Sequence, residues 1–399
     1  MTPTTPPDPR PRVMQVITHL DLGGAEEVAL ALTEELGREC AFTVFAVQGV
    51  PDTPFGREMQ ARLRRLDVPV EVGTPLDIKA GGLLHAGARL RRALRRVRPD
   101  VVHLHTDIPD ATYAASLLFG ADPAGLRVVR TVHNTTLWPK WRRVGRWVER
   151  RLEHAHQVAV SEDSLASLHG FRARQGLGRL PDGQCEVVYN GVAFRGQRPA
   201  TRPPGPARVL FAGRFEPQKG ADLLPAILGR AAELTSEAAE VTLLGQGSLG
   251  GFLKRWVDTA PLRWPVTLTP PVPGLSSRLG DFDVVIMPSR FEGLALLGIE
   301  TLMAGTPLVA SNVDGLRELF PPDSPLLAGP EDVEGFARRL AAVVEAPEEY
   351  ARRARALVAP TEARFGLARM TQAYLGLYRA GAHGAAVPAP GARAGGVPA

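Results

Sequence analysis

Residues 281–300 read DFDVVIMPSRFEGLALLGIE and combine a short apolar run with a longer apolar segment. The run Val284–Met287 is typical of a parallel strand that is covered on both faces. The loop that follows holds Glu292 and Gly293, and apolar residues then continue to Glu300. A strand, a loop and a helix in this order predict one β-α unit of a parallel sheet.

The same alternation of short β-branched runs and helical segments extends over most of the chain. Strands are predicted at 13–18, 42–47, 68–72, 100–105, 128–132, 158–161 and 186–189, and again at 208–212, 240–244, 266–269, 283–287 and 308–310. The stretch RGQRPATRPPGPA at 195–207 interrupts the pattern and predicts a linker. We therefore predict an α/β chain of two Rossmann-like, doubly wound domains that face each other across a cleft, with ligands at the carboxyl ends of the strands.

The predicted organisation has six parts. They are a disordered arm at 1–12, an N-terminal domain at 13–195, a linker at 196–207, a C-terminal domain at 208–360, a final helix at 361–381 and a disordered tail at 382–399. The arm is rich in proline and lacks the apolar segment of a signal peptide. The tail consists mostly of Ala, Gly and Pro.

Composition excludes several classes of protein. Hydrophobic residues make up 44% and charged residues 22%, as in ordinary globular proteins, and the net charge of +5 is low for a nucleic-acid binder. Two distant cysteines form neither a disulfide framework nor a zinc site, which favours a reducing compartment. We expect a cytoplasmic protein without a membrane span and without a nucleic-acid partner.

Two short motifs are interpreted as structural. Gly245-Gln-Gly247-Ser-Leu-Gly250 matches a dinucleotide fingerprint, but the next predicted strand ends in two prolines and not in the acidic residue that such a site requires. Asp281-Phe-Asp283 resembles a metal-binding pair, but it precedes a strand and so lies at the wrong edge of a parallel sheet. We expect neither a cofactor nor a metal ion.

Candidate anion-binding residues follow the first strand of each domain. Gly23 and Gly24 open a helix, where free backbone amides and the helix dipole favour an anion. Gly213-Arg214 and Lys219-Gly220 place two cations next to glycines, a combination suited to a diphosphate. A solvated basic loop is the structural alternative.

Carboxylates and histidines complete the candidate site. Glu292 is expected in a loop and Glu300 about two turns into a largely buried helix, with the amides of 293–297 forming a second anion site between them. His105 and the pair His133-Asn134 end strands of the first domain, whereas His103 is interpreted as structural. Ordinary capping and surface roles are the alternative for the two glutamates.

These motifs together resemble a known enzyme family. The ordered set GGAE (23–26), TVHN (131–134), VSE (160–162), VVYNGV (187–192), FAGRFEPQKG (211–220), GQG (245–247) and SRFEGLALLGIE (289–300) is similar to the retaining nucleotide-sugar glycosyltransferases of family 4, which have the GT-B fold. The resemblance covers roughly residues 13–380. It implies that the first domain binds the acceptor, that the second binds the nucleotide sugar, and that the final helix crosses back to the first.

The resemblance also implies a role for each candidate residue. Arg214 and Lys219 would hold the donor diphosphate, Glu292 the sugar hydroxyls and Glu300 the ribose hydroxyls, with His133 beside the transferred sugar. The remaining donor contacts would come from Gly23, Gly24, Gly213, Gly245, Gly247, Gly293, Leu294, Ala295, Leu296 and Leu297. His105 and Asn134 are candidates for the acceptor side. The segment 314–318, DGLRE, departs from the family, which often has two glycines before this turn.

The implied reaction moves a hexosyl group from a nucleoside-diphosphate sugar to an acceptor. No carboxylate stands in the motif as a nucleophile, and the mechanism that the resemblance implies is front-face transfer with the diphosphate as base. A nucleotide-sugar epimerase of the same fold and a non-catalytic nucleotide-sugar-binding relative are the alternatives.

One region also suits a membrane surface. Residues 51–151 contain 19 basic and 10 acidic side chains. Arginines around 89–98 and 142–151 flank apolar positions, and Trp138, Trp141 and Trp147 interleave with Lys140 and its basic neighbours. Such helices suit peripheral contact with anionic lipid and a lipid-linked or envelope acceptor. The structural alternative is a set of solvated arginine-rich helices.

Overall fold

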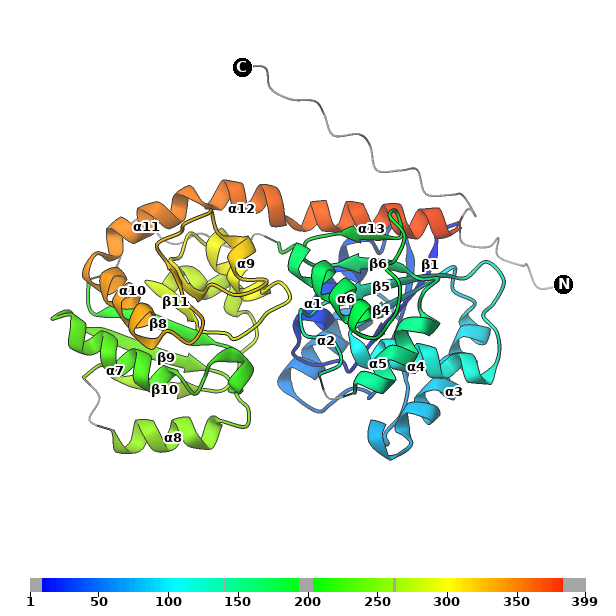
Figure 1. Ribbon diagram of the computed structural model, residues 1–399, viewed down its shortest axis with the longest axis horizontal. Coiled ribbons are helices and arrows are strands. Elements are labelled where there is room, and N and C mark those ends of the chain that lie inside the picture. Colours follow the sequence, from blue (N-terminus) through cyan, green and yellow to red (C-terminus); the bar gives the residue numbers. More distant parts are fainter. Residues whose placement is uncertain (1–8, 140, 194–203, 261–262, 383–399) are drawn as a thin grey trace, which may run out of the picture.

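Two parallel sheets organise the chain within residues 9–139, 141–193, 204–260 and 263–382, the part that the computed structural model describes (Figure 1). The first sheet has the strand order β3-β2-β1-β4-β5-β6-β7. Its strands are β1 (Arg12–Ile17), β2 (Ala41–Ala46), β3 (Val70–Val72), β4 (Val101–His105), β5 (Arg127–Val132), β6 (His156–Ala159) and β7 (Cys185–Val187). The second sheet has the order β10-β9-β8-β11-β12-β13. Its strands are β8 (Ala207–Ala212), β9 (Ala239–Leu244), β10 (Val266–Thr269), β11 (Val284–Met287), β12 (Leu308–Ser311) and β13 (Leu327–Ala328).

Helices connect the strands and cover both faces of each sheet. The first domain contains α1 (Gly24–Glu35), α2 (Pro54–Arg65), α3 (Gly82–Val97), α4 (Asp107–Ser116), α5 (Arg142–Arg151) and α6 (Glu162–Arg174). The second contains α7 (Leu224–Leu234), α8 (Gly250–Thr259), α9 (Leu296–Met303), α10 (Val333–Glu345) and α11 (Pro347–Ala356). Short 3-10 turns lie at Ile78–Ala80, Leu117–Phe119, Pro217–Lys219, Leu275–Asp281 and Arg317–Leu319.

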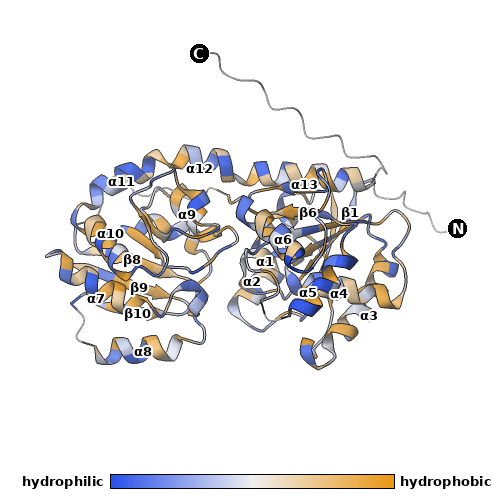
Figure 2. Cartoon of the chain, in the orientation of Figure 1, coloured by the Kyte–Doolittle hydropathy of each residue, from blue (hydrophilic) through white to orange (hydrophobic). Residues whose placement is uncertain are grey.

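The central strands are buried because helices pack on both of their faces. Every residue of β4 and β11 is buried, and Figure 2 shows apolar strands inside shells of mixed helices. Separate apolar clusters lie on the two faces of each sheet. The prediction of two doubly wound parallel domains is therefore confirmed, and the carboxyl ends of the central strands are the edge at which site residues are expected.

The end of the chain crosses from the second domain to the first as two helices, α12 (Val358–Phe365) and α13 (Leu367–Ala382) (Figure 1). The prediction of one helix over 361–381 is wrong, because the helix breaks at Gly366, which is in an extended conformation. The break is fixed by Val192, whose N–H donates to Phe365 and whose carbonyl accepts from Leu367. The inner side of α13 then packs on the first sheet, where Tyr374 bonds Thr131 of β5 and Tyr378 bonds His103 of β4.

Most other differences from the sequence prediction are small. Strand ends shift by one or two residues, Ala207 belongs to β8 and not to the linker, and the two-residue strand β13 was not predicted. The predicted arm, linker and tail fall mostly on residues 1–8, 194–203 and 383–399, which lie outside the described residues. No helix within the described residues is long and apolar enough to span a membrane.

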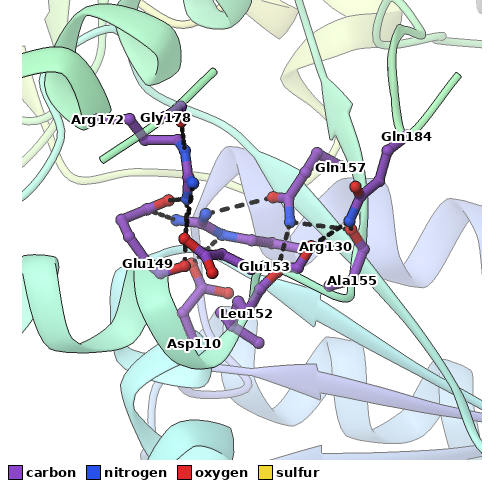
Figure 3. Close-up of polar contacts among 10 residues, drawn as sticks. All are labelled: Asp110, Arg130, Glu149, Leu152, Glu153, Ala155, Gln157, Arg172, Gly178 and Gln184. Atoms are coloured by element: carbon purple, nitrogen blue, oxygen red, sulfur yellow. Dashed lines mark hydrogen bonds and ion pairs between the residues drawn. The ribbon is translucent and has the colours of Figure 1, made fainter. Parts of the chain in front are cut away.

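A cluster of buried charges fixes β5 against the helices α4, α5 and α6 (Figure 3). Arg130 lies 2.7 Å from Asp110 and 2.8 Å from Glu149, and all three side chains are at most 2% exposed. Glu149 also pairs with Arg172, 3.4 Å away. Burial raises the pKa of Asp110 to about 7 in spite of the adjacent guanidinium. All four side chains belong to the first domain and pair with one another, so we interpret this cluster as structural.

Candidate active site

The loop after β8 and the loop after β11 bring two of the expected residues together. The Lys219 ammonium donates to both oxygens of Glu292, at 2.7 and 2.9 Å. Ser289 donates to the same carboxylate at 2.7 Å. Because β8 and β11 are neighbours in the sheet, their carboxyl-end loops meet, as parallel topology requires. Glu292 is 5% exposed, so the ammonium offsets the cost of burying its charge.

Arg214 lies in the same loop as Lys219 but points toward solvent. It is exposed, and its Nη2 donates to Gln218 at 2.7 Å. Burial raises the pKa of Glu26 in the first domain to about 7, and the charge of the Arg214 guanidinium opposes this rise. Arg214 therefore lies at the side of the second domain that faces the first.

Glycines let three loops of the second domain stack closely. A Cβ on Gly220, which has φ 65°, would lie 2.0 Å from the carbonyl oxygen of Pro288. A Cβ on Gly245 would lie 2.0 Å from the carbonyl oxygen of Gly213, and one on Gly247 2.6 Å from that of Phe215. The GQG turn after β9 is thus packed against the turn after β8, which accounts for its glycines without a dinucleotide.

The segment 292–297 ends in the N-terminus of α9. The helix begins at Leu296, with Ala295 as N-cap and no side-chain cap. Glu300 therefore lies about one turn into the helix and is half-buried, which corrects the prediction of two turns and deep burial. The first amides of a helix have no partner within it, so this end of α9 presents free donors.

The turn between β1 and α1 contributes Gly23 and Gly24 and faces the second domain. A Cβ on Gly24 would lie 3.8 Å from Leu296. Glu26, two residues later, was not among the predicted site residues. Its side chain folds back on Gly23 and accepts hydrogen bonds from the amides of Thr18 and Glu26.

Burial is what distinguishes Glu26 from an ordinary helix-capping residue. It is 6% exposed, and desolvation raises its pKa to about 7. Its place as the third residue of α1, after an N-cap glycine, is the signal that sequence reasoning passed over.

His133 closes the first-domain side of the site. Its ring is half-buried, and its Nε2 lies 3.1 Å from Nδ1 of His105. Loss of solvation lowers the pKa of His133 to about 3, so the ring is neutral. His105 itself is fully buried and bonds Gln15 at 2.8 Å. The expectation that His105 faces the acceptor is therefore wrong, because its ring is buried between its hydrogen-bond partners Gln15 and His133.

The neighbouring histidine, His103, is buried between β5 and α13. It bonds Tyr378 at 2.8 Å and Thr131 at 2.7 Å, in agreement with the structural interpretation. Asn134 follows His133 at the same turn, next to the second domain. A Cβ on Gly293 would lie 1.8 Å from the carbonyl oxygen of His133 and 3.2 Å from the Asn134 nitrogen. The two domains thus touch directly at this point, and only glycine fits at 293.

The segment 314–318, which departs from the family pattern, also contacts the first domain. Glu318 accepts from the amides of Glu162 and Asp163 at the N-terminus of α6, where the helix dipole favours an acid. Arg317 lies 3.1 Å from Asp163 in return. These contacts show an interdomain role for the segment.

The Asp281-Phe-Asp283 pair lies at the opposite edge of the sheet. Asp283 accepts from the amide of Arg208, the residue beside it at the start of β8. No group of three or more potential metal ligands occurs among the described residues. The position of Asp283 agrees with its interpretation as a strand-entry residue.

Sequence comparisons match two adjoining family profiles to this chain. Glycosyltransferase Family 4 matches residues 22–194, and Glycosyl transferases group 1 matches residues 195–356. A glycogen synthase of Mycobacterium tuberculosis is 29% identical over 77% of this chain and 76% of its own length. A D-inositol 3-phosphate glycosyltransferase of Pseudarthrobacter chlorophenolicus is 30% identical over 67% and 68%.

Solved structures share the fold at low sequence identity. Anabaena HepE, solved in complex with UDP-glucose, superposes with a TM-score of 0.72 over 91% of this chain and 97% of its own, at 19% identity. The arrangement of two sheets is therefore that of GT-B proteins.

Proposed function

Because the chain belongs to glycosyltransferase family 4, with the GT-B fold and a nucleotide-sugar donor, we propose that it transfers a hexosyl group with retention of configuration. The observation that supports this proposal most strongly is the Lys219–Glu292 ion pair at 2.7 Å. It lies at the carboxyl ends of adjacent strands, beside the exposed Arg214 and the free amides that precede α9. This is the edge at which parallel sheets bind ligands.

The charges of this site match those of a nucleoside-diphosphate sugar. Arg214, Lys219 and the amides of 293–297 stabilise the diphosphate as negative charge develops on the leaving oxygen. Glu292, fixed by Lys219 and Ser289, accepts hydrogen bonds from hydroxyls of the donor sugar. Glu300 holds the ribose. The turns at Gly24 and Gly213, where an added Cβ would meet no atom closer than 3.8 Å, leave room for the nucleotide, and the turn at Gly245 and Gly247 packs beside them.

His133 acts as a hydrogen-bonding group and not as a proton donor. A pKa of about 3 keeps the imidazole neutral, and its bond to His105 orients the ring. The diphosphate is then the base for an acceptor that attacks from the leaving-group side, with Asn134 on the acceptor side. The relatives named above include a glycogen synthase and a D-inositol 3-phosphate glycosyltransferase. Because these names give different acceptors, they do not identify the acceptor of this chain.

Transfer is expected without a divalent metal, since two cations and a helix N-terminus already face the phosphates. The test is a transfer assay with UDP-, GDP- and ADP-glucose in the presence and absence of EDTA. Formation of a glycoside of unchanged anomeric configuration in EDTA supports the proposal. Recovery of an epimerised donor, or binding without turnover, favours the epimerase or the non-catalytic relative, and loss of activity that Mn²⁺ restores contradicts metal independence.

Burial removes several side chains from the surface that was expected to contact a membrane. Arg91 is 1% exposed and bonds Ser116 and Ala121, and Trp138 is 2% exposed against Gly145, so neither can contact lipid as expected. Trp141 and Trp147 pack partly on the core, and Lys140 lies outside the described residues.

The remaining candidate is one surface of α3 and the adjoining turn. The exposed apolar side chains Leu84, Leu118 and Phe119 lie on these two elements, next to the exposed cations Arg92, Arg95 and Arg96. We propose peripheral contact of this surface with anionic lipid, which would suit a lipid-linked acceptor.

Vesicle co-sedimentation tests this surface. Binding to anionic vesicles at low salt should fall when Arg92, Arg95 and Arg96 become Gln. The same change at Arg338, Arg352 and Arg353, which are exposed in the second domain, is the matched control. Absence of binding at low salt contradicts the membrane proposal and favours a soluble acceptor.

A further inference from the structure

Three side chains of the first domain bind three consecutive carbonyls of the second. The bonds are Thr135 Oγ1 to Glu292 O at 3.1 Å, Ser161 Oγ to Gly293 O at 2.7 Å and Asn190 Nδ2 to Leu294 O at 3.2 Å. Both Ser161 and Asn190 are buried. The carbonyls belong to the segment that leads into α9.

The spacing of these donors comes from the sheet itself. Thr135, Ser161 and Asn190 follow β5, β6 and β7, which are neighbours at one end of the first sheet. Each strand ends two or three residues before its donor. Each of the three neighbouring strands is thus followed by one hydrogen-bond donor, and the three donors bond consecutive residues of the second domain.

The three bonds determine where the amides of the loop point. In a planar trans peptide, the C=O of one residue and the N–H of the next point in opposite directions. Carbonyls of 292–294 that face the first domain therefore turn the N–H groups of Gly293, Leu294 and Ala295 away from Thr135, Ser161 and Asn190. None of these three N–H groups donates a backbone hydrogen bond in the described part of the chain.

Close packing leaves the loop little freedom to rotate. The backbone at Gly293 lies directly on the turn that carries His133, since a Cβ there would be 1.8 Å from the carbonyl oxygen. Gly315 also packs on this segment, since a Cβ there would lie 2.4 Å from the carbonyl oxygen of Gly293. A backbone packed this closely keeps its free amides in one arrangement, as a binding site for an anion requires.

We propose that Thr135, Ser161 and Asn190 are positioning residues, which hold segment 292–294 so that its amides form the diphosphate cradle only when the two domains are closed. This inference rests on the proposed function for the identity of the anion. It adds that these three side chains build part of the donor site without touching the donor themselves.

The first test separates the hydroxyl of Thr135 from its shape. Thr135→Val removes the hydrogen bond, whereas Thr135→Ser retains it. We expect Thr135→Val to raise KM for the nucleotide sugar about 2- to 10-fold, the range for one net hydrogen bond, and Thr135→Ser to stay near wild type. Thr306→Val is the matched control, because its buried hydroxyl donates to the Leu279 carbonyl within the second domain, at 3.0 Å.

The triple variant Thr135→Val, Ser161→Ala, Asn190→Ala should weaken UDP, GDP or ADP binding by more than any single variant does. Titration calorimetry with these three nucleotides gives the dissociation constants. Equal affinity of the wild type and the triple variant would overturn the inference. If none of the three binds the wild type, the proposed function fails instead.

Small-angle scattering without nucleotide then decides the inference on its own. The triple variant should show a larger radius of gyration than the wild type, because the domains are no longer tied together. The Thr306→Val control should not. An unchanged radius in the triple variant would contradict the link between these side chains and closure, whatever the nucleotide measurements show.

Discussion

Two charge clusters of this protein differ in where their partners come from. Arg130, Asp110 and Glu149 are all at most 2% exposed and form ion pairs within one domain, from β5, α4 and α5. Lys219 is 22% exposed and pairs with Glu292, while Arg214 beside it reaches solvent. The first cluster leaves no room for a ligand, whereas the second keeps cations at an edge between two domains. Charge alone therefore does not mark a site, but charge at an interdomain strand edge does.

The largest effect is expected from breaking the buried cluster. Arg130→Met leaves Asp110 and Glu149 without their shared cation and should cost about 3–5 kcal/mol of the free energy of unfolding. Arg353→Met removes a surface pair with Glu349 and should change the stability by less than about 1 kcal/mol. Urea unfolding measures both. Similar values for the two variants would show that the buried cluster is not structural.

Breaking the second cluster should affect turnover more than folding. Lys219→Met removes a cation from the developing diphosphate and should lower kcat by about 10²-fold or more. It also leaves the buried Glu292 without a cation and with only the Ser289 hydroxyl bonded to its carboxylate, so the melting temperature should fall. Adding Glu292→Gln should restore the melting temperature without restoring turnover. Turnover that recovers together with stability would mean that the pair is structural, like the first cluster.

Glu292 of the second cluster and Glu300 of α9 should differ in whether their loss affects transfer of the sugar or binding of the nucleotide. Glu292→Gln should lower kcat while leaving nucleoside diphosphate affinity near wild type, since its proposed partners are sugar hydroxyls. Glu300→Ala should weaken the nucleotide itself by about 2- to 10-fold, as expected for a lost hydrogen bond to a ribose. Calorimetry and initial rates give both values. The reverse assignment of losses would contradict the proposed roles.

A smaller effect is expected from the buried His103, which changes the dependence of stability on pH. Burial lowers the pKa of His103 well below 6.5, so the folded protein keeps it neutral while the unfolded chain takes up a proton. The stability that this difference contributes is present above about pH 6.5 and is lost as the pH falls below it. The raised pKa values of Asp110 and Glu26, both about 7, act in the opposite direction.

The change in melting temperature between pH 7.5 and 5.5, compared between the wild type and a His103 variant, measures the contribution of His103. His103→Gln should reduce the loss of stability on acidification relative to the wild type, although it is less stable at neutral pH because the bonds to Tyr378 and Thr131 change. An identical slope in both proteins would show that His103 does not titrate differently on folding.

How far the sequence predicts the structure depends on whether the relevant contact is local. The apolar run Val284–Met287 predicts a central strand because all four of its residues are apolar. Lys219 and Glu292 were assigned to one site because each follows a predicted strand and ligands bind at the carboxyl ends of parallel strands. The break at Gly366 was not predicted, since it is fixed by Val192, far away in the chain.

The same distinction explains the errors at the site. His105 ends a strand like His133, but only the packed structure shows that Gln15 covers it. Burial of Arg91 and Trp138 likewise depends on neighbouring helices. The hydrogen bonds from Thr135, Ser161 and Asn190 cross between domains, and no spacing within one segment indicates them.

The central claim is that a donor diphosphate binds between Arg214, Lys219 and the N-terminus of α9. Titration calorimetry of UDP, GDP and ADP against the wild type, the double variant Arg214→Ala, Lys219→Met and an Arg353→Met control tests it most directly. The account predicts that at least one nucleotide binds the wild type and the control equally and that the folded double variant binds it about 10-fold or more weakly, since charged hydrogen bonds contribute most. Equal affinity in all three proteins would place the diphosphate elsewhere and contradict the account.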